Sequence, residues 1–421
     1  MTAGLAVAVA IIATIVVAVA VGIFVFVTTP EVAGRAASRS SQAVQAASVC
    51  AAVIGGAITL WLSNIRRDHD RSQLAMERRR LDDQRFGQAV SMLKEEGDAA
   101  RIGAIEMLRD LATLEPDRTQ AVLDILGAVI RIPAVVRTRT RVARPRARNR
   151  DDIVQEAALR AMRRLLPPAD DAGDTVYTVD LSGADVEDLD FRGVRLRIRA
   201  NGTRFHGAVT LVGATIESDS SFSDATFYKA AWFDEARFVD RSWFARTAFE
   251  GVASFNGTTW GRELRFDDAR CHGDLKMAGM RNLGQPVVAQ LSGLNVGGDL
   301  VMKDSRVFGA ITLGGASIAG VVDLSSVQVV GGVQLAGATC GKDVVLDHAE
   351  IGATVKASGA SVGGTVSLCD AVLSAVSLTD TRSGPSMVDR SRARMTGRLH
   401  MRPGVSLKGE LAQDSGERVR G

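Results

Sequence analysis

The sequence has little cysteine and little histidine. Its 421 residues include 4 cysteines and 5 histidines. Such scattered cysteines do not form a disulfide framework, so we expect buried, reduced thiols in a reducing compartment. The histidines are too far apart in the chain to show a metal-ligand spacing; they are His69, His206, His272, His348 and His400. We therefore predict neither a metal nor a cofactor.

Proline is absent between Pro286 and Pro385, whereas the chain contains 42 glycines. This combination favours a regular backbone with many tight corners and argues against a disordered tract of low complexity. A strong excess of one charge is also missing, because the formal net charge is +3 at pH 7. The overall charge therefore favours neither a nucleic-acid coat nor an acidic mimic.

Charge is absent from residues 2–29, which are almost wholly apolar. About twenty such residues cross a bilayer as a helix. A second apolar run, residues 43–65, is interrupted by Ser48 and Thr59. We predict two transmembrane helices within residues 1–66; the alternative for the second run is a buried or interfacial helix.

Basic residues follow the second apolar run, whereas the connecting segment has only two arginines, offset by Glu31. The basic residues are Arg66, Arg67, Arg71, Arg78, Arg79 and Arg80. An excess of arginine and lysine marks the cytoplasmic side of a membrane segment. We therefore expect a multi-pass protein of the cell membrane with both termini in the cytoplasm. The composition, rich in alanine, arginine and valine and poor in lysine, suggests a bacterium with a high-GC genome, such as an actinobacterium.

Residues 67–168 are predicted to form an α-helical stalk and cap. Apolar residues recur at helical spacing in residues 102–111 and 119–132, and a last helix is expected to stop before Pro167. The segment 101–111 and the helix after it resemble helical pairs of the HEAT or armadillo type. We expect these helices to cover the open end of the repeat that follows.

An arginine-rich loop is expected at residues 137–150. Its candidate contacts to an anionic surface are Arg137, Arg139, Arg141, Arg144, Arg146, Arg148 and Arg150. Such a run fits a solvated loop, a contact with anionic lipid headgroups, or a contact with nucleic acid. Aromatic side chains for base stacking are not interleaved with these arginines, so we do not expect nucleic acid as a partner.

From Phe222 to Leu373 a large apolar residue recurs at alternating intervals of five and six residues. Two half-turns of about eleven residues give a turn of about twenty-two, and a fixed period of this kind indicates a solenoid. A small side chain precedes many of these residues by two positions, as Ala225 precedes Phe227. Positions two apart on a strand share a face, so both residues are predicted to point inward.

This pattern resembles the pentapeptide-repeat family. The fragments that carry the resemblance include Leu181-Ser-Gly-Ala184, Ala225-Thr-Phe227, Ala236-Arg-Phe238 and Gly315-Ala-Ser-Ile318, and it extends over about residues 179–378. It implies a right-handed, four-sided parallel β-helix, which we place at residues 175–405, before a disordered tail at 406–421. A three-sided β-helix is the alternative, against which the five-six alternation counts.

The alternation departs from the family's strict step of five. We expect the extra residue to widen two of the four corners, where glycines such as Gly320, Gly341 and Gly352 would adopt positive φ. Residues 280–290, which include Pro286, interrupt the rhythm and are predicted to form a looped-out corner.

No set of residues in the sequence predicts catalysis. The segment Gly337 to Asp343 is similar to a phosphate-binding loop, but it is one residue short and ends in aspartate. Asp267 and Asp268 are adjacent, and adjacent residues on a strand face opposite ways. We therefore predict a protein that is not an enzyme and has no catalytic or cofactor-binding residue.

The functional prediction is a membrane-tethered scaffold or protein-interaction module. It would present the β-helix to an unknown protein partner in the cytoplasm, and it could also self-associate through the ends of the β-helix. The alternative comes from the family resemblance, because some members mimic duplex DNA and protect a type II topoisomerase. Those proteins have a strongly acidic face, whereas residues 179–378 are only mildly acidic and a membrane anchor would hold them away from the nucleoid.

Overall fold

The computed structural model describes residues 79–131, 150–282, 288–378, 384–401 and 404–411, and a few isolated positions before them. The chain divides into two compact units, Met1–Arg85 and Phe86–Gly421, and the second contains the fold discussed below. The predicted membrane hairpin, residues 1–66, lies outside the described residues apart from isolated positions. Of the helices that are described, none is both long and apolar enough to cross a membrane.

Three α-helices precede the β-structure: α3 (Asp98–Leu114), α4 (Thr119–Arg131) and α5 (Arg150–Leu165). A single 3-10 turn, η1 (Pro116–Arg118), joins the first two. Helix α4 is amphipathic, and its buried residues Val122, Leu123, Leu126 and Ile130 recur at helical spacing. Helix α5 ends two residues before Pro167, as proline disfavours helical geometry in the residue before it.

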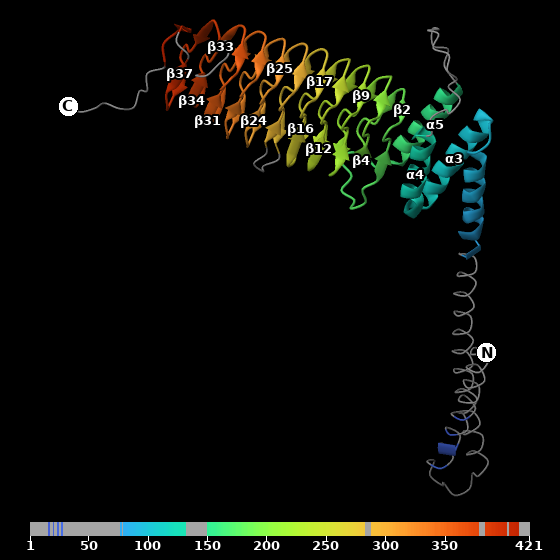
Figure 1. Ribbon diagram of the computed structural model, residues 1–421. Coiled ribbons are helices and arrows are strands. Elements are labelled where there is room, and N and C mark those ends of the chain that lie inside the picture. Colours follow the sequence, from blue (N-terminus) through green and yellow to red (C-terminus); the bar gives the residue numbers. More distant parts are fainter. Residues whose placement is uncertain are drawn as a thin grey trace. The chain divides into compact units, whose positions relative to one another are not determined.

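The strands after α5 form a parallel β-helix with four strands in each regular turn, stacked turn upon turn (Figure 1). In one turn the chain passes through β9 (Thr226–Phe227), β10 (Ala231–Trp232), β11 (Arg237–Phe238) and β12 (Arg241–Trp243). The next strand, β13 (Ala248–Phe249), pairs with β9 and so begins the next turn. Four strands per turn confirm the four-sided prediction over the three-sided alternative.

Two of the four sides are separate sheets. The 9-stranded sheet contains β2 (Asp185–Val186), β5 (Arg204–Phe205), β9, β13, β17 (Arg270–Cys271), β21 (Asn295–Val296), β25 (Ser317–Ile318), β29 (Thr339–Cys340) and β32 (Ser361–Val362). The 11-stranded sheet contains β3 (Leu189–Asp190), β6 (Val209–Thr210), β10, β14 (Ala253–Ser254), β18 (Leu275–Lys276), β22 (Leu300–Val301), β26 (Val322–Asp323), β30 (Val344–Val345), β33 (Thr365–Ser367), β35 (Met387–Asp389) and β38 (Ser406–Lys408).

The other two sides are joined in one 18-stranded sheet by the long strands β4 (Arg195–Arg199), β31 (Glu350–Lys356) and β34 (Val372–Leu378). One side holds β7 (Thr215–Ile216), β11, β15 (Thr259–Trp260), β19 (Arg281–Asn282), β23 (Arg306–Val307), β27 (Gln328–Val329) and β36 (Arg394–Met395). The adjoining side holds β8 (Ser220–Ser221), β12, β16 (Glu263–Arg265), β20 (Ala289–Gln290), β24 (Ile311–Thr312), β28 (Val333–Gln334) and β37 (Leu399–Met401), and β1 (Thr178–Asp180) pairs with β4.

The register between turns is constant through most of the solenoid. Phe227 pairs with Phe249, and Val329 pairs with Ile351. Partners in this register, such as Asp224 and Arg246, are 22 residues apart in the chain. The turn that includes the pairing of Leu264 with Ala289 is longer, and its partners Asp274 and Asp299 are 25 residues apart. It contains the predicted interruption at residues 280–290, of which 283–287 lie outside the described residues.

The register is shorter at both ends of the solenoid. Near the start Asp185 pairs with Arg204, and the two are 19 residues apart in the chain. At the far end β35 pairs with β38, which brings Arg390 to Gly409 O, again 19 residues away. This last pairing places β38 in the solenoid, so the expected disordered tail does not begin at residue 406; residues 412–421 lie outside the described residues.

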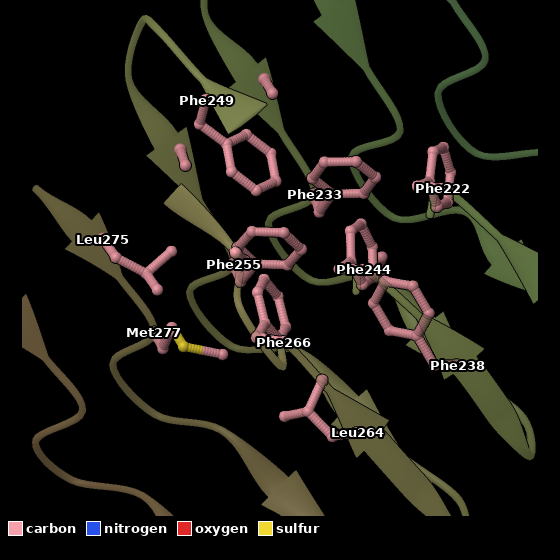
Figure 2. Close-up of a cluster of buried hydrophobic side chains, with 14 of the residues drawn as sticks. Phe222, Phe233, Phe238, Phe244, Phe249, Phe255, Leu264, Phe266, Leu275 and Met277 are labelled. Atoms are coloured by element: carbon pink, nitrogen blue, oxygen red, sulfur yellow. The ribbon is translucent and has the colours of Figure 1, made fainter. Parts of the chain in front are cut away.

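The first half of the core is a set of stacked aromatic columns (Figure 2). Phe222, Phe244 and Phe266 stack with ring centroids 4.9 and 4.8 Å apart. Phe233 lies edge-on to this column, with its ring at 84° to that of Phe222, and stacks on Phe255 at 4.6 Å. Aromatic rings favour both offset stacks and edge-to-face contacts, so the columns stabilise one another as well as themselves.

The second half of the core is aliphatic, because the same inward positions hold leucine, isoleucine and valine. Leu291, Leu313 and Leu335 continue one column and are each 2 % exposed or less. Two cysteines occupy a neighbouring column: Cys271 is 3 % exposed and Cys340 is 1 % exposed. Both are free thiols, which agrees with the expectation from the sequence.

The positive-φ corners differ from the prediction. Asp224, Glu235 and Arg246, which recur once in each half-turn, have φ of 60°, 59° and 55°. The predicted corner glycines, such as Gly341 and Gly352, do not have positive φ. Glycine is required there for another reason: a Cβ on either would lie 2.4 Å from a carbonyl oxygen of the preceding turn. Close stacking of turns, and not left-handed geometry, therefore selects these glycines.

Helices α4 and α5 cover the first turn of the solenoid, as expected from the sequence (Figure 1). The Gln120 side chain of α4 donates to Thr178 O at 2.9 Å and accepts from Thr178 N at 2.8 Å. Gln155 of α5 repeats this arrangement on β2, donating to Asp185 O at 2.7 Å and accepting from Glu187 N at 3.0 Å. Two glutamine amides thus take the place of a preceding β-strand.

Ion pairs and close packing reinforce the cap. Arg131 of α4 contacts the Asp180 carboxylate at 2.5 Å, and Arg163 of α5 contacts that of Asp190 at 2.6 Å. A Cβ at Gly127 would lie 2.8 Å from Asp180 O, so α4 approaches the first turn as closely as a glycine permits. The helices and solenoid share one hydrophobic core. The edge of the first turn is therefore closed to another chain.

Candidate interaction surface

The arginines singled out from the sequence are not located by the structure. Arg137, Arg139, Arg141, Arg144, Arg146 and Arg148 lie outside the described residues. Arg150 is the first residue of α5, and its side chain also lies outside the description. The expected contact of this loop with an anionic surface therefore stays a prediction. The surface features that follow belong to the solenoid, where the register sorts outward side chains into rows.

The outward row of the 11-stranded sheet has no continuous charge. In strand order it contains Asp190, Thr210, Trp232, Ser254, Lys276, Val301, Asp323, Val345, Ser367 and Asp389. Carboxylates at the neighbouring corner bond to the next turn: Asp274 accepts from Asp299 N, and Asp299 accepts from Val321 N. These aspartates bridge successive turns. The face does not resemble a strongly acidic rod.

A polar cluster lies on the 9-stranded sheet. Arg204 donates two hydrogen bonds to the Asp185 carboxylate, at 2.8 and 2.7 Å, and His206 Nε2 lies 2.8 Å from the same group. These bonds, that of Arg204 first, hold the pKa of Asp185 well below its usual range. The His206 ring stacks on Tyr228 at 5.0 Å in the next turn. Sequence inspection missed this cluster because its residues are about twenty positions apart in the chain and come together only when adjacent turns pair.

The same column continues with Glu250 and His272, whose Oε2 and Nδ1 atoms lie 2.8 Å apart. Each of these two histidines thus contacts a carboxylate of an adjacent turn. Within the described part of the chain, no group of three or more histidine, cysteine, aspartate or glutamate side chains could hold a metal ion.

The remaining candidate motifs occupy corners of the solenoid. Asp268 has a φ of 56°, and burial raises the pKa of its neighbour Asp267. The loop similar to a phosphate site begins at Gly337, which has a φ of 69°, and ends at Asp343, which accepts a hydrogen bond from Thr365 N at 2.6 Å. The residues of both motifs therefore shape the corners of the solenoid or bond to the next turn.

An arginine row follows one side of the 18-stranded sheet. Arg237, Arg281 and Arg306 occupy equivalent outward positions, with Thr259 between the first two and the last two adjacent in register. Within the described residues Arg237 and Arg281 form no ion pair, and Arg306 donates to the neutral amide of Gln328 at 2.8 Å.

The carboxylates near this row have other partners. Glu217 contacts Arg195 at 2.6 Å, and Glu263 contacts Arg265 at 2.7 Å. Like charges in register on a sheet are destabilising unless something neutralises them. The arginine row therefore carries positive charge that the described side chains leave uncompensated.

A groove of about 620 Å³ follows the arginine row toward the end of the chain. It lies over β23, β27, β31, β34 and β36, and its lining residues are Arg306, Phe308, Gln328, Val329, Val330, Glu350, Ile351, Gly352, Val372, Leu373, Ser374 and Thr396. Its size falls within the range of about 300–1,000 Å³ that is usual for binding sites. Sequence inspection did not reveal it, because its walls come from five different turns.

The structure is a regular repeat, as its constant register, four strands per turn and aromatic columns show. Comparison with known families also finds a repeat. Residues 200–247 and 239–281 match the model of pentapeptide repeats (9 copies). The match supports the resemblance found in the sequence, and it covers the phenylalanine-rich half of the solenoid. No curated protein and no solved structure matches the chain.

Proposed function

We propose that this protein is a membrane-tethered, non-enzymatic scaffold whose β-helix binds a protein partner in the cytoplasm. The observation that carries the proposal is that inward and outward side chains of each turn have separate roles. Inward residues form the core, whereas outward residues are held in fixed rows by a constant register between turns. A rigid surface with rows of side chains at a constant spacing suits recognition of another macromolecule, as in other solenoids.

The membrane part of the proposal rests on the sequence. Residues 2–29 and 43–65 are apolar runs followed by clustered arginines, which favours a hairpin with both termini in the cytoplasm. The bacterial, actinobacterial origin proposed from the composition is compatible with a protein of the cell membrane that has a cytoplasmic solenoid. The arginine-rich segment 137–150 would then lie on the side of the anionic headgroups.

Protection of a topoisomerase by DNA mimicry has less support. A DNA mimic needs a continuous row of negative charge, and the outward row of the 11-stranded sheet alternates Asp190 and Asp323 with threonine, lysine and valine. The arginine row of the 18-stranded sheet has the opposite sign. We therefore place the partner among proteins that bind a cationic or apolar surface.

Proximity labelling of the full chain in its own host tests the proposal. A biotin ligase fused to the C-terminus should label a small set of cytoplasmic or envelope proteins reproducibly. The control is the same ligase fused to residues 1–85 alone, which keeps the proposed anchor and lacks the solenoid. Identical labelling by both fusions would contradict a scaffold role, and enrichment of type II topoisomerase subunits would favour the alternative.

A further inference from the structure

The groove on the 18-stranded sheet exists because side chains shrink along one column. Phe308, Val330, Gly352 and Ser374 occupy equivalent positions in successive turns. The shrinkage is enforced at Gly352, where a Cβ would lie 2.4 Å from Val330 O. No other residue fits at that point without moving the backbone. The floor of the groove is thus a consequence of close stacking between turns.

Exposed apolar side chains gather at this groove. Within the described residues from 288 to 401, the exposed large hydrophobic side chains are Val288, Phe308, Val330 and Val372, and the last three line the groove. Val330 is 63 % exposed and Val372 is 44 % exposed. An apolar cluster in a concave surface with a polar rim is typical of an interaction site.

Opposite charges lie along the groove, with Arg306 in its first turn and Glu350 two turns further on. Arg281 and Arg306 are adjacent in register, and both lack a carboxylate partner within the described residues. In the following turns Gln328 Nε2 donates to Glu350 Oε2 at 3.1 Å. Gln328 therefore connects the cation to the anion and fixes their order along the groove.

These features define the occupant. A nucleic acid or an anionic lipid would meet the Glu350 carboxylate and the apolar wall formed by Val330 and Val372, which suit neither phosphate nor bases. Strands β23, β27, β31 and β34 beneath the groove are paired on both sides, so an occupant above them cannot extend the sheet. Recognition must come from side chains: acidic groups against the arginines and an apolar group against Phe308 and Val330.

We propose that this groove binds an extended polypeptide segment in which acidic residues lie next to aliphatic or aromatic residues. The acidic part lies against Arg281 and Arg306, and the apolar part occupies the space above Gly352. The proposal rests on the scaffold function and specifies its binding face and the chemistry of its partner.

Phage display of random twelve-residue peptides against the purified full chain tests the proposal. Selected peptides should share acidic residues next to apolar residues. Their affinity, measured by fluorescence anisotropy, should fall at least tenfold in the double variant Arg281→Ser/Arg306→Ser and in Val330→Glu. Affinity for the double variant should also lose much of its dependence on salt, because surface charge pairs are screened by ions.

Two matched substitutions control for general effects. Val252→Glu changes a valine that is 49 % exposed outside the groove, and Arg270→Ser removes an outward arginine of the 9-stranded sheet. Both should leave peptide affinity within twofold. The proposal is overturned if no peptide is enriched, if selected peptides bind the groove variants and the parent equally, or if vesicles with anionic lipid require the same groove residues.

These outcomes remain distinct from the fate of the scaffold function. If proximity labelling finds partners whose recovery is unaffected by Val330→Glu, the scaffold function stands and the groove proposal fails. If labelling finds no solenoid-dependent partner but groove-specific peptides bind, the groove is a peptide site and the scaffold function fails.

Discussion

At the scale of single residues, aromatic stacking between turns holds the first half of the solenoid together. Phe244 shows the pattern, because it stacks on Phe222 and Phe266 at 4.9 and 4.8 Å and meets Phe233 edge-on at 89°. It is fully buried. Each such ring touches the turns above and below, so its contribution is shared between three turns.

Replacing Phe244 by alanine should therefore be costly. We expect Phe244→Ala to lower the free energy of unfolding by about 3–5 kcal/mol, since it removes a buried ring and leaves a cavity. The measurement is denaturant unfolding followed by circular dichroism. Phe308→Ala, at a position that is 39 % exposed, should cost less than about 1 kcal/mol. Equal losses for the two variants would show that the stacked columns are not the main source of stability.

Burial also controls the chemistry of the cysteines. It raises the pKa of Cys271 to about 12 and that of Cys340 to about 11. The reactive thiolate is therefore scarce at neutral pH. Burial also keeps alkylating reagents away from both sulfur atoms.

We expect Cys271 and Cys340 to resist iodoacetamide at pH 8 in the folded protein and to react in denaturant. Cys369, which is less buried, should react sooner than both. Mass spectrometry of tryptic peptides reports the order of modification. Modification of Cys271 as rapid as that of Cys369 would contradict the inward position of its side chain.

At the scale of elements, corners and caps decide which turns can stack. Gly341 illustrates the corner: its missing side chain leaves room for Ala319 O of the preceding turn. At the first turn, Gln120 and Gln155 form hydrogen bonds with backbone N–H and C=O groups that have no neighbouring strand. In both cases the residue contacts backbone atoms that are distant from it in the sequence.

Two glycine substitutions separate close approach from simple loss of flexibility. Gly341→Ala places a Cβ 2.4 Å from a carbonyl oxygen and should destabilise the protein by at least about 1–3 kcal/mol. Gly273→Ala meets no atom within 4 Å and should change stability by less than about 1 kcal/mol, in either direction. Thermal unfolding of the two variants provides the comparison, and similar destabilisation by both would refute the stacking explanation.

Removing the glutamine contacts should open the first turn. The double variant Gln120→Ala/Gln155→Ala leaves two backbone N–H and two C=O groups without partners, at a cost of about 1–3 kcal/mol for each buried group left unpaired. Hydrogen exchange should accelerate at β1 and β2 before the rest of the solenoid. The exposed Gln334→Ala serves as the control. Unchanged exchange at β1 and β2 would mean that packing of α4 and α5 alone closes this end.

The sequence predicted the turn and its inward residues because they follow a fixed linear period. Phe227 and Phe249 are one period apart in the chain and are partners in register. It also predicted the interruption near Pro286, where the turn is longer. The predicted role of Gly341 and Gly352 was wrong, because a period along the chain does not reveal which backbone lies against it. Positive φ falls instead on a different set of corner positions, which hold glycines such as Gly315 as well as other residues such as Asp224.

The candidate site could not be predicted for a related reason. Arg306, Val330 and Gly352 are ordinary surface residues in the sequence, and they line one groove only because successive turns stack. The contacts of Gln120 and Gln155 with the first turn are similarly non-local. The arginines at 137–150, which are conspicuous in the sequence, stay a prediction.

At the scale of the whole molecule, the solenoid presents different chemistry on each side. The 11-stranded sheet carries a mixed row, the 9-stranded sheet carries the cluster of Asp185, Arg204 and His206, and the 18-stranded sheet carries the arginine row and the groove. A partner that approaches one sheet therefore meets a surface unlike those of the other two sheets. This difference between sheets lets the proposed scaffold bind a partner on one face.

Photo-crosslinking inside the host cell tests this account most directly. A photoreactive amino acid introduced at Val330, within the full chain, should capture a discrete protein, and the product should disappear with Arg281→Ser/Arg306→Ser. The same amino acid at Val252, on another side, should not capture that protein. Identical products from both positions, or a Val330 product that persists without the two arginines, would contradict the account.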